Sequence, residues 1–185
     1  ELGNVDFAQW EKLTEDLAAI SDVSFEEEIA AHVISVKLKL KQLMIFGLPL
    51  NDPEIVVTRD SDAWLVEIEN KMLGGLVTIP DADDEPFNID LNHLTLEANE
   101  DGIDPLADVW PMMIDRFNFS TEKLVIDSED YGSWAFEYRT NGDVARFEKL
   151  KAIAPGLNIL PSSTIQWQRQ SSGHSSHFQG LVTVE

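Results

Sequence analysis

The sequence contains no cysteine, which excludes disulfide bonds, thiolate metal sites and a cysteine nucleophile. It is also poor in basic residues, because 13 lysines and arginines stand against 34 aspartates and glutamates, for a formal net charge of -21. A surface of this charge repels nucleic acid and anionic lipid head groups, so we expect no nucleic-acid partner. No run approaches the roughly 20 apolar residues that a membrane-spanning helix needs.

The N-terminus is acidic and begins with Glu1 instead of Met, so it does not have the features of a signal peptide. We therefore expect the chain to be a piece of a longer protein, in which any anchor or targeting segment lies elsewhere. At 185 residues, 43% of them hydrophobic, the chain has the size of one domain or of two small modules that share a sheet.

One strand pattern occurs three times. It reads apolar-x-apolar-x-apolar-x-x-Leu-x-apolar and covers residues 36–45, 87–96 and 117–126, the last with Thr121 at the third apolar position. Strict alternation indicates a half-buried strand. The one-residue slip before the Leu exchanges the two faces, as a β-bulge or a strong local twist does. We therefore predict repeated, bent β-strands.

Helix is predicted only near the N-terminus, where apolar residues recur at spacings of three and four. These residues are Phe7, Trp10, Leu13, Leu17 and Ile20. After them, turn-forming residues such as Asn141-Gly142 separate about ten strands in antiparallel meander order. The predicted strands cover residues 33–46, 54–59, 63–69, 72–79, 87–96, 115–127, 132–141, 144–154, 157–170 and 174–185.

The domain organisation follows from these strands and from the Gly- and Pro-containing stretch between them. We expect an N-terminal helical segment in residues 1–32, a first β-module in 33–98, a linker in 99–114 and a second β-module in 115–185. One continuous sheet is expected to run through both modules. The fold class is therefore mainly β, with long, curved antiparallel meander sheets and a short N-terminal amphipathic helix.

The polar residues form no catalytic motif. Most acidic residues outside the strands are expected to be solvated charges of turns and loops, and not a glycosidase-like acid pair. The four histidines lack zinc-ligand spacing, and neither a calcium loop, a nucleophile elbow nor a phosphate-binding glycine loop is present. We expect a protein that is not an enzyme and that needs no cofactor or metal.

The remaining signal is apolar, because most aromatic residues occupy alternating strand positions. They predict either an ordinary sandwich core or a curved sheet whose concave face stays open to hold acyl chains. A chain of about 16 carbons gains on the order of 10 kcal/mol at about 0.8 kcal/mol per methylene. The candidate groove residues are Val36, Leu38, Leu40, Trp64, Val66, Ile68, Phe87, Ile89, Leu91, Phe117, Phe119, Trp134 and Phe136.

A series of motifs resembles one protein family; the resemblance rests mainly on residues 115–185 and covers most of the chain after about residue 36. The series comprises 72–80 (MLGGLVTIP), 123–126 (KLVI), Gly132-x-Trp134-x-Phe136, Asn141-Gly142, the strand 147–154, Gly156-Leu157, Trp167 and Phe178-Gln179-Gly180. In this order they resemble the recurring module of the AsmA-like envelope proteins of Gram-negative bacteria, in particular the YhdP type. The chain lacks the N-terminal membrane helix of that family and is much shorter than a full-length member.

The resemblance implies a repeating β-groove that conducts phospholipid between the inner and outer membranes. It implies a periplasmic location within an inner-membrane-anchored protein whose anchor is not in this chain. The expected partners are phospholipid acyl chains and neighbouring β-modules of the same longer chain. The alternatives are a structural or protein-interaction β-sandwich of the cell envelope and, third, an enzyme that acts on envelope glycans.

Overall fold

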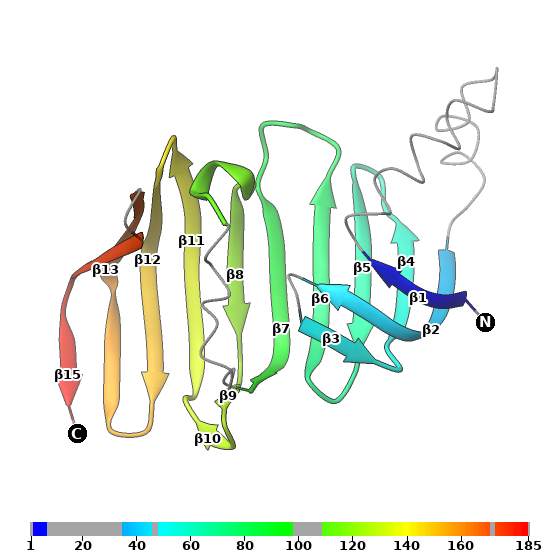
Figure 1. Ribbon diagram of the computed structural model, residues 1–185, viewed down its shortest axis with the longest axis horizontal. Coiled ribbons are helices and arrows are strands. Elements are labelled where there is room, and N and C mark those ends of the chain that lie inside the picture. Colours follow the sequence, from blue (N-terminus) through cyan, green and yellow to red (C-terminus); the bar gives the residue numbers. More distant parts are fainter. Residues whose placement is uncertain (1, 7–34, 46–47, 98–108, 171–172, 185) are drawn as a thin grey trace.

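A computed structural model describes residues 2–6, 35–45, 48–97, 109–170 and 173–184, and these form one large curved sheet (Figure 1). The prediction of a mainly β fold is confirmed. Apart from one turn of 3-10 helix, η1 (Pro111–Met113), every element of the described residues is a strand. The predicted N-terminal helix falls within residues 7–34, outside the described residues.

The first half of the sheet follows the predicted strands closely, except that the strands at residues 2–6 and 48–51 were not predicted and the first of them lies in the expected N-terminal helical segment. Its strands are β1 (Leu2–Asp6), β2 (Ser35–Ile45), β3 (Leu48–Asn51), β4 (Glu54–Arg59), β5 (Ala63–Glu69), β6 (Leu73–Pro80) and β7 (Phe87–Leu96). The turn between β5 and β6 forms because the Asn70 side chain accepts a hydrogen bond from the Met72 backbone N–H at 2.6 Å. Turn chemistry therefore sets these strand ends.

The second half departs from the prediction at two divided strands and at one short additional strand, residues 129–130. Its strands are β8 (Phe117–Thr121), β9 (Leu124–Ile126), β10 (Glu129–Asp130), β11 (Ser133–Asn141), β12 (Val144–Ala154), β13 (Leu157–Gln170), β14 (Gly173–Gln179) and β15 (Val182–Val184). The single strands predicted over 115–127 and 174–185 are wrong, because each is divided in two. The second division lies at Gly180, which packs so closely on Ser163 that a Cβ would lie 2.1 Å from the Ser163 Oγ.

The order of the main path is β1-β2-β4-β5-β6-β7-β8-β11-β12-β13-β14, and the sheet is not closed. Most neighbours are antiparallel as predicted. However, β7 runs parallel to both β8 and β9, and β1 runs parallel to β2, so the sheet is mixed. The chain between β7 and β8 spans residues 97–116, which exceeds the dozen or so that a parallel connection needs.

The parallel junction places two copies of the strand pattern side by side and in register. Phe87 lies opposite Phe117, Ile89 opposite Phe119, and Leu94 opposite Leu124. A constant offset of 30 residues therefore relates the two copies along their whole length. Through this junction the sheet continues from the first expected module into the second.

The predicted slip corresponds to a distortion in each copy. In β7, Gly75 pairs with Leu91 and Gly74 pairs with His93, so Asn92 is an extra residue in the ladder. In the third copy the slip separates β8 from β9. In β2, residues before Leu40 pair with β4, and residues after it pair with β3. The strands bend where the pattern slips.

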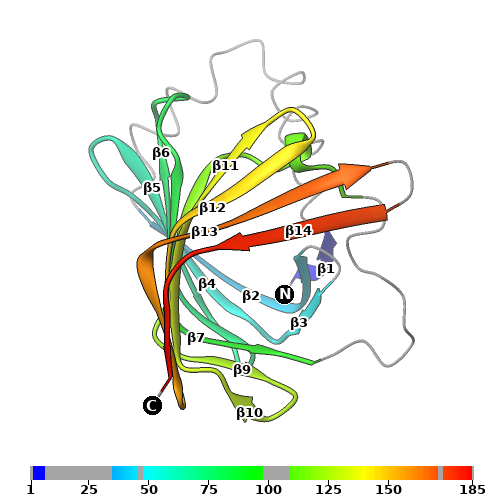
Figure 2. The same ribbon diagram turned by 90° about the vertical axis from the view of Figure 1, so that its left-hand side faces the viewer.

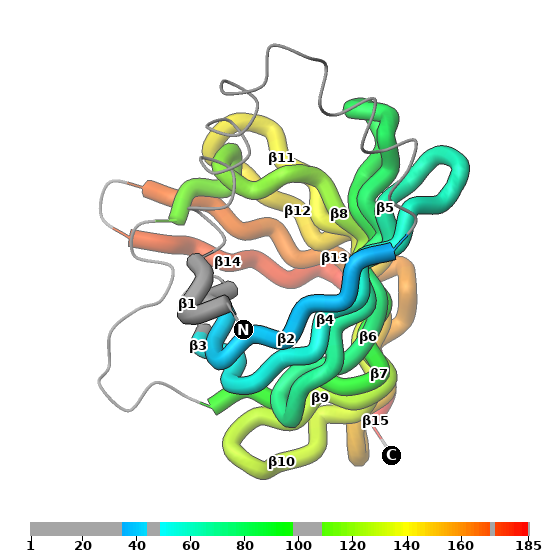
Figure 3. The backbone as a smooth tube through the Cα atoms, turned by 90° about the vertical axis from the view of Figure 1, so that its right-hand side faces the viewer, coloured from blue at the N-terminus to red at the C-terminus, as the bar shows by residue number. Residues whose placement is uncertain are grey.

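These bends give the sheet a concave side, seen along its long axis in Figure 2 and from the opposite end in Figure 3. Three clusters of buried residues lie along the sheet. One joins β2, β3, β4 and β5 through Leu40, Leu50 and Ile68. The second is centred on Tyr138 and the third on Leu150. The core is therefore a row of local clusters and not one central core.

Candidate functional site

The register between strands places all thirteen predicted groove residues on one face of the sheet, because directly paired residues point to the same side. One row of paired residues crosses from β2 to β11 and consists of Val36, Val57, Val66, Val77, Ile89, Phe119 and Phe136. A second row crosses from β7 to β14 and consists of Phe87, Phe117, Tyr138, Phe147, Ile165 and Phe178. The other predicted residues lie two or four positions along the same strands.

The apolar face is the concave face. Leu43 and Leu50, at the turn from β2 to β3, pack against Ile55 and Ile68 of that face. At the other end of the sheet the Tyr138 hydroxyl donates to the Pro111 carbonyl of η1 at 3.1 Å. Both β3 and η1 lie on the concave side in Figure 2. We call this concave apolar face the trough; it runs across the strands along the long axis of the molecule (Figure 1).

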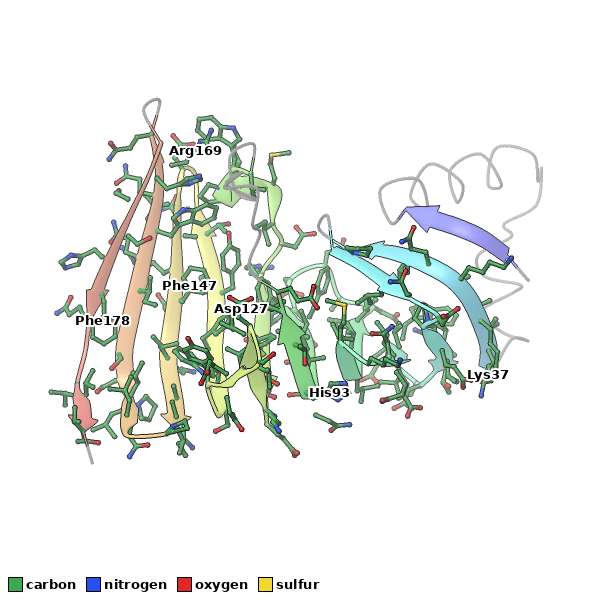
Figure 4. The ribbon with its side chains drawn as sticks, turned by 60° about the horizontal axis from the view of Figure 1, so that its bottom comes forward. Lys37, His93, Asp127, Phe147, Arg169 and Phe178 are labelled. Carbon is green, nitrogen blue, oxygen red and sulfur yellow. The ribbon has the colours of Figure 1, made fainter. Side chains whose placement is uncertain are left out.

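The sequence prediction missed several trough residues. Register adds Ile55, Val57, Val77, Ile79, Tyr138, Phe147, Ile165 and Trp167 to the same face. Phe147 and Phe178, which are labelled in Figure 4, extend it across β12 and β14. The signal for the second half was present in the sequence, because Asn141-Gly142 predicts a hairpin; the two-residue turn that sets the pairing of β11 with β12 consists of Gly142 and Asp143.

Stacked aromatic rings on β8, β11 and β12 form the floor of the trough. The rings of Phe117 and Tyr138 stack at 4.8 Å, and those of Phe119 and Phe136 stack at 4.9 Å. Phe147 meets the rings of Phe136 and Tyr138 edge-on at 5.1 and 5.3 Å. These distances and angles are those that aromatic pairs prefer, so the floor is a rigid apolar surface.

The trough is open except where β3 packs beside Leu40 and Ile68 and where η1 covers Tyr138. Of the thirteen predicted residues, Leu40, Ile68 and Leu91 are buried and Val36 is exposed, while the other nine are half-buried. A second sheet packed across this face would bury large apolar side chains almost fully. All the described strands belong to one sheet, whose first and last strands do not pair with each other. Apolar side chains therefore line a surface that a ligand can reach.

The convex face carries a polar network at the parallel junction. The Asn118 side chain donates to the Asn88 oxygen across the parallel junction at 2.8 Å, and Arg139 donates to Asn118 at 2.8 Å. Arg139 and Lys149 also contact the carboxylate of Glu137. Such a network satisfies its own polar groups and specifies the register of the junction. At this junction the two faces of the sheet therefore differ in chemistry.

Titratable groups near the trough are held in structural contacts. The Arg59 guanidinium donates to both carboxylate oxygens of Asp81 and lies 5.2 Å from the Trp64 ring centre. Hydrogen bonding to Arg59 lowers the pKa of Asp81 below its usual value. Burial raises the pKa of Tyr138 to about 12. His93 contacts the Asn70 carbonyl at 3.0 Å, and Trp167 donates to His174 at 3.0 Å.

Within the described part of the chain, no three histidine, aspartate or glutamate side chains are grouped so that they could hold a metal ion. The same residues include no helix with the length and apolar character needed to cross a bilayer. Comparison with protein-family models, with curated proteins and with solved structures finds no match to this chain.

Proposed function

We propose that this chain is a non-enzymatic, lipid-carrying module of an AsmA-like envelope protein of the YhdP type. In this proposal the trough holds phospholipid acyl chains in the periplasm as they pass between the inner and outer membranes. The module belongs to a longer, inner-membrane-anchored chain. The motifs that resemble the family, from residue 72 onward, support this assignment together with the open curved sheet.

The continuous apolar face is the observation that carries the proposal. It crosses the sheet from Val36 on β2 to Phe178 on β14, and half-buried aromatic and aliphatic side chains line it. Acyl chains need no specific polar partner, only a long apolar surface from which water is displaced. At about 0.8 kcal/mol per methylene, a chain of about 16 carbons gains on the order of 10 kcal/mol there.

Site-specific photocrosslinking tests the proposal in cells. Photoreactive side chains replace Leu38, Ile89 and Phe119, which lie on the concave face of β2, β7 and β8. All three positions should capture phospholipid, because their side chains line the surface proposed to hold acyl chains. The crosslinked lipid is identified by mass spectrometry after purification of the protein.

Neighbouring residues supply matched controls on the opposite face. Lys39, Asp90 and Ser120 each follow one of the three test positions, so their side chains point to the convex side. They should capture little or no lipid in the same experiment. Absence of lipid at all three concave positions, or equal capture on both faces, would refute the proposed function.

The alternative is a structural or protein-interaction module of the cell envelope. One corner of the sheet favours it, because apolar side chains there are exposed. Ile153 is 53% exposed, Leu181 is 61% exposed and Val184 is 79% exposed. If this function is correct, photoreactive groups at these positions crosslink protein, while the concave positions capture no lipid.

A further inference from the structure

A pocket lies at the rim of the trough, where the parallel junction begins. The loop 81–86 between β6 and β7 meets the segment that leads from η1 into β8 (Figure 1). The pocket has a volume of about 570 Å³, within the range of about 300–1,000 Å³ that small-ligand sites occupy. Its position brings together residues that are about 30 apart in the sequence.

The floor of the pocket is continuous with the trough. Ile79 pairs with Trp64, and Phe87 pairs with Phe117, so both floor residues belong to the concave apolar face. Ile114 also lines the pocket and packs against the aromatic cluster around Tyr138. An acyl chain lying on the floor of the trough near β7 and β8 would therefore place its polar end at this pocket.

The pocket rim has a mixed charge. Asp83, Glu85, Asp115 and Arg116 all line it, and all four are exposed. The Arg116 side chain donates to the Asp83 backbone carbonyl at 3.3 Å. That bond uses one of the five N–H donors of a guanidinium. Within the described residues Arg116 has no carboxylate at ion-pair distance.

We propose that this rim pocket selects a zwitterionic phospholipid head group that carries a primary ammonium beside its phosphate. This inference rests on the proposed lipid-carrying function and adds a head-group preference to it. Arg116 receives the phosphate, because a guanidinium donates in pairs to phosphate oxygens. Asp83, Glu85 and Asp115 receive the ammonium, which has three N–H donors.

The charge and the side chains of the pocket rim disfavour the other common phospholipid head groups. Three carboxylates against one arginine leave the rim negative, so a head group with net negative charge is repelled. A quaternary ammonium has no N–H donor, and its usual receptor is a cage of aromatic rings. Among the described residues that line this pocket, Phe87 alone is aromatic, and it lies in the floor. A primary ammonium fits the rim best.

Lipid competition tests the preference on the whole chain. The protein is incubated with vesicles of equal parts phosphatidylethanolamine, phosphatidylcholine and phosphatidylglycerol with identical acyl chains, and the retained lipids are quantified by mass spectrometry. Phosphatidylethanolamine should be enriched roughly two- to fivefold over either competitor, the effect expected of one exposed ion pair. Higher salt should reduce the enrichment, since exposed charges are screened.

Variants that neutralise the charged side chains test whether this pocket causes the head-group preference. The triple variant Asp83→Asn, Glu85→Gln and Asp115→Asn should lose the enrichment but still retain lipid. The matched control is the triple variant Asp84→Asn, Glu129→Gln and Asp143→Asn, which removes three exposed carboxylates outside the pocket. This control should keep the enrichment of phosphatidylethanolamine. Arg116→Gln should lower the retention of all three lipids, because each carries a phosphate.

The outcomes separate this inference from the proposed function. Retained lipid with no head-group preference, or a preference that survives in the pocket triple variant, overturns the inference and leaves the lipid-carrying function standing. An equal loss of preference in the control triple variant also overturns it, since net charge would then be the cause. Retention of no lipid overturns both.

Discussion

Two glycines of the second half provide a controlled test of how closely β11 and β12 pack. Gly132 and Gly142 both have a positive φ, of +66° and +61°. A Cβ added at Gly142 would meet nothing within 4 Å, whereas one at Gly132 would lie 1.9 Å from the Ile153 carbonyl oxygen. Alanine at the two positions therefore carries the cost of a positive φ in both cases, and the clash is added only at Gly132.

The expected destabilisation follows from these distances. A left-handed residue other than glycine costs about 1–2 kcal/mol, and alanine recovers about 0.4–1 kcal/mol by restricting the unfolded chain. Gly142→Ala should therefore lower the free energy of unfolding by about 1 kcal/mol. In Gly132→Ala the backbone must shift, which strains the 2.7 Å bond from the Leu124 N–H to the Gly132 carbonyl. We expect a total loss of about 3–4 kcal/mol there.

Urea unfolding followed by tryptophan fluorescence measures both variants. The dependence of the unfolding free energy on urea should stay constant, so that the shift in midpoint reports stability alone. A loss in Gly132→Ala that equals the loss in Gly142→Ala within about 0.5 kcal/mol would show that the close approach of Gly132 to β12 is absent.

Two further predictions concern pH. Burial raises the pKa of Tyr138 to about 12, so its stabilising contribution is complete below about pH 10 and is lost as pH rises toward 12, about 3 kcal/mol in all. Tyr138→Phe should remove that alkaline loss. It should also lower stability at neutral pH by about 1 kcal/mol, because the hydrogen bond to Pro111 is lost. If the pH midpoint of alkaline unfolding is the same in Tyr138→Phe as in the wild type, Tyr138 is not the group responsible. Hydrogen bonds from Arg59 lower the pKa of Asp81 below 3.8, so this contribution is present above about pH 4 and is lost as pH falls through the lowered pKa. The melting temperature should therefore fall less steeply between about pH 6 and pH 3 in Asp81→Asn than in the wild type. Parallel curves of melting temperature against pH for the two proteins would count against the contact.

Local sequence patterns were sufficient for most strands. β4, β5, β12 and β13 have the predicted bounds, because alternation and turn residues act over only a few positions. The same alternation assigned the thirteen trough residues to one face of their strands. The slip in the pattern also indicated where strands would bend, since a one-residue shift must exchange the two faces.

Other features needed the tertiary structure. The division at Gly180 depends on its contact with Ser163, which lies on another strand. Neither residue carries a local signal of that approach. Likewise, Asp83 and Glu85 are ordinary loop carboxylates in the sequence, and Asp115 is the first residue of a predicted strand. They form a pocket with Arg116 only because the parallel junction brings β7 and β8 together.

The sequence by itself therefore determined the strand content, the polar and apolar faces and the positions of the bends, since each depends on neighbours within a few residues. Only the tertiary structure decided that β7 and β8 run parallel, that the apolar face is the concave one and that the sheet stays open. These properties depend on which distant strands pair and on the accumulated bend of many strands. No short segment encodes them, because each is a sum over contacts far apart in the chain.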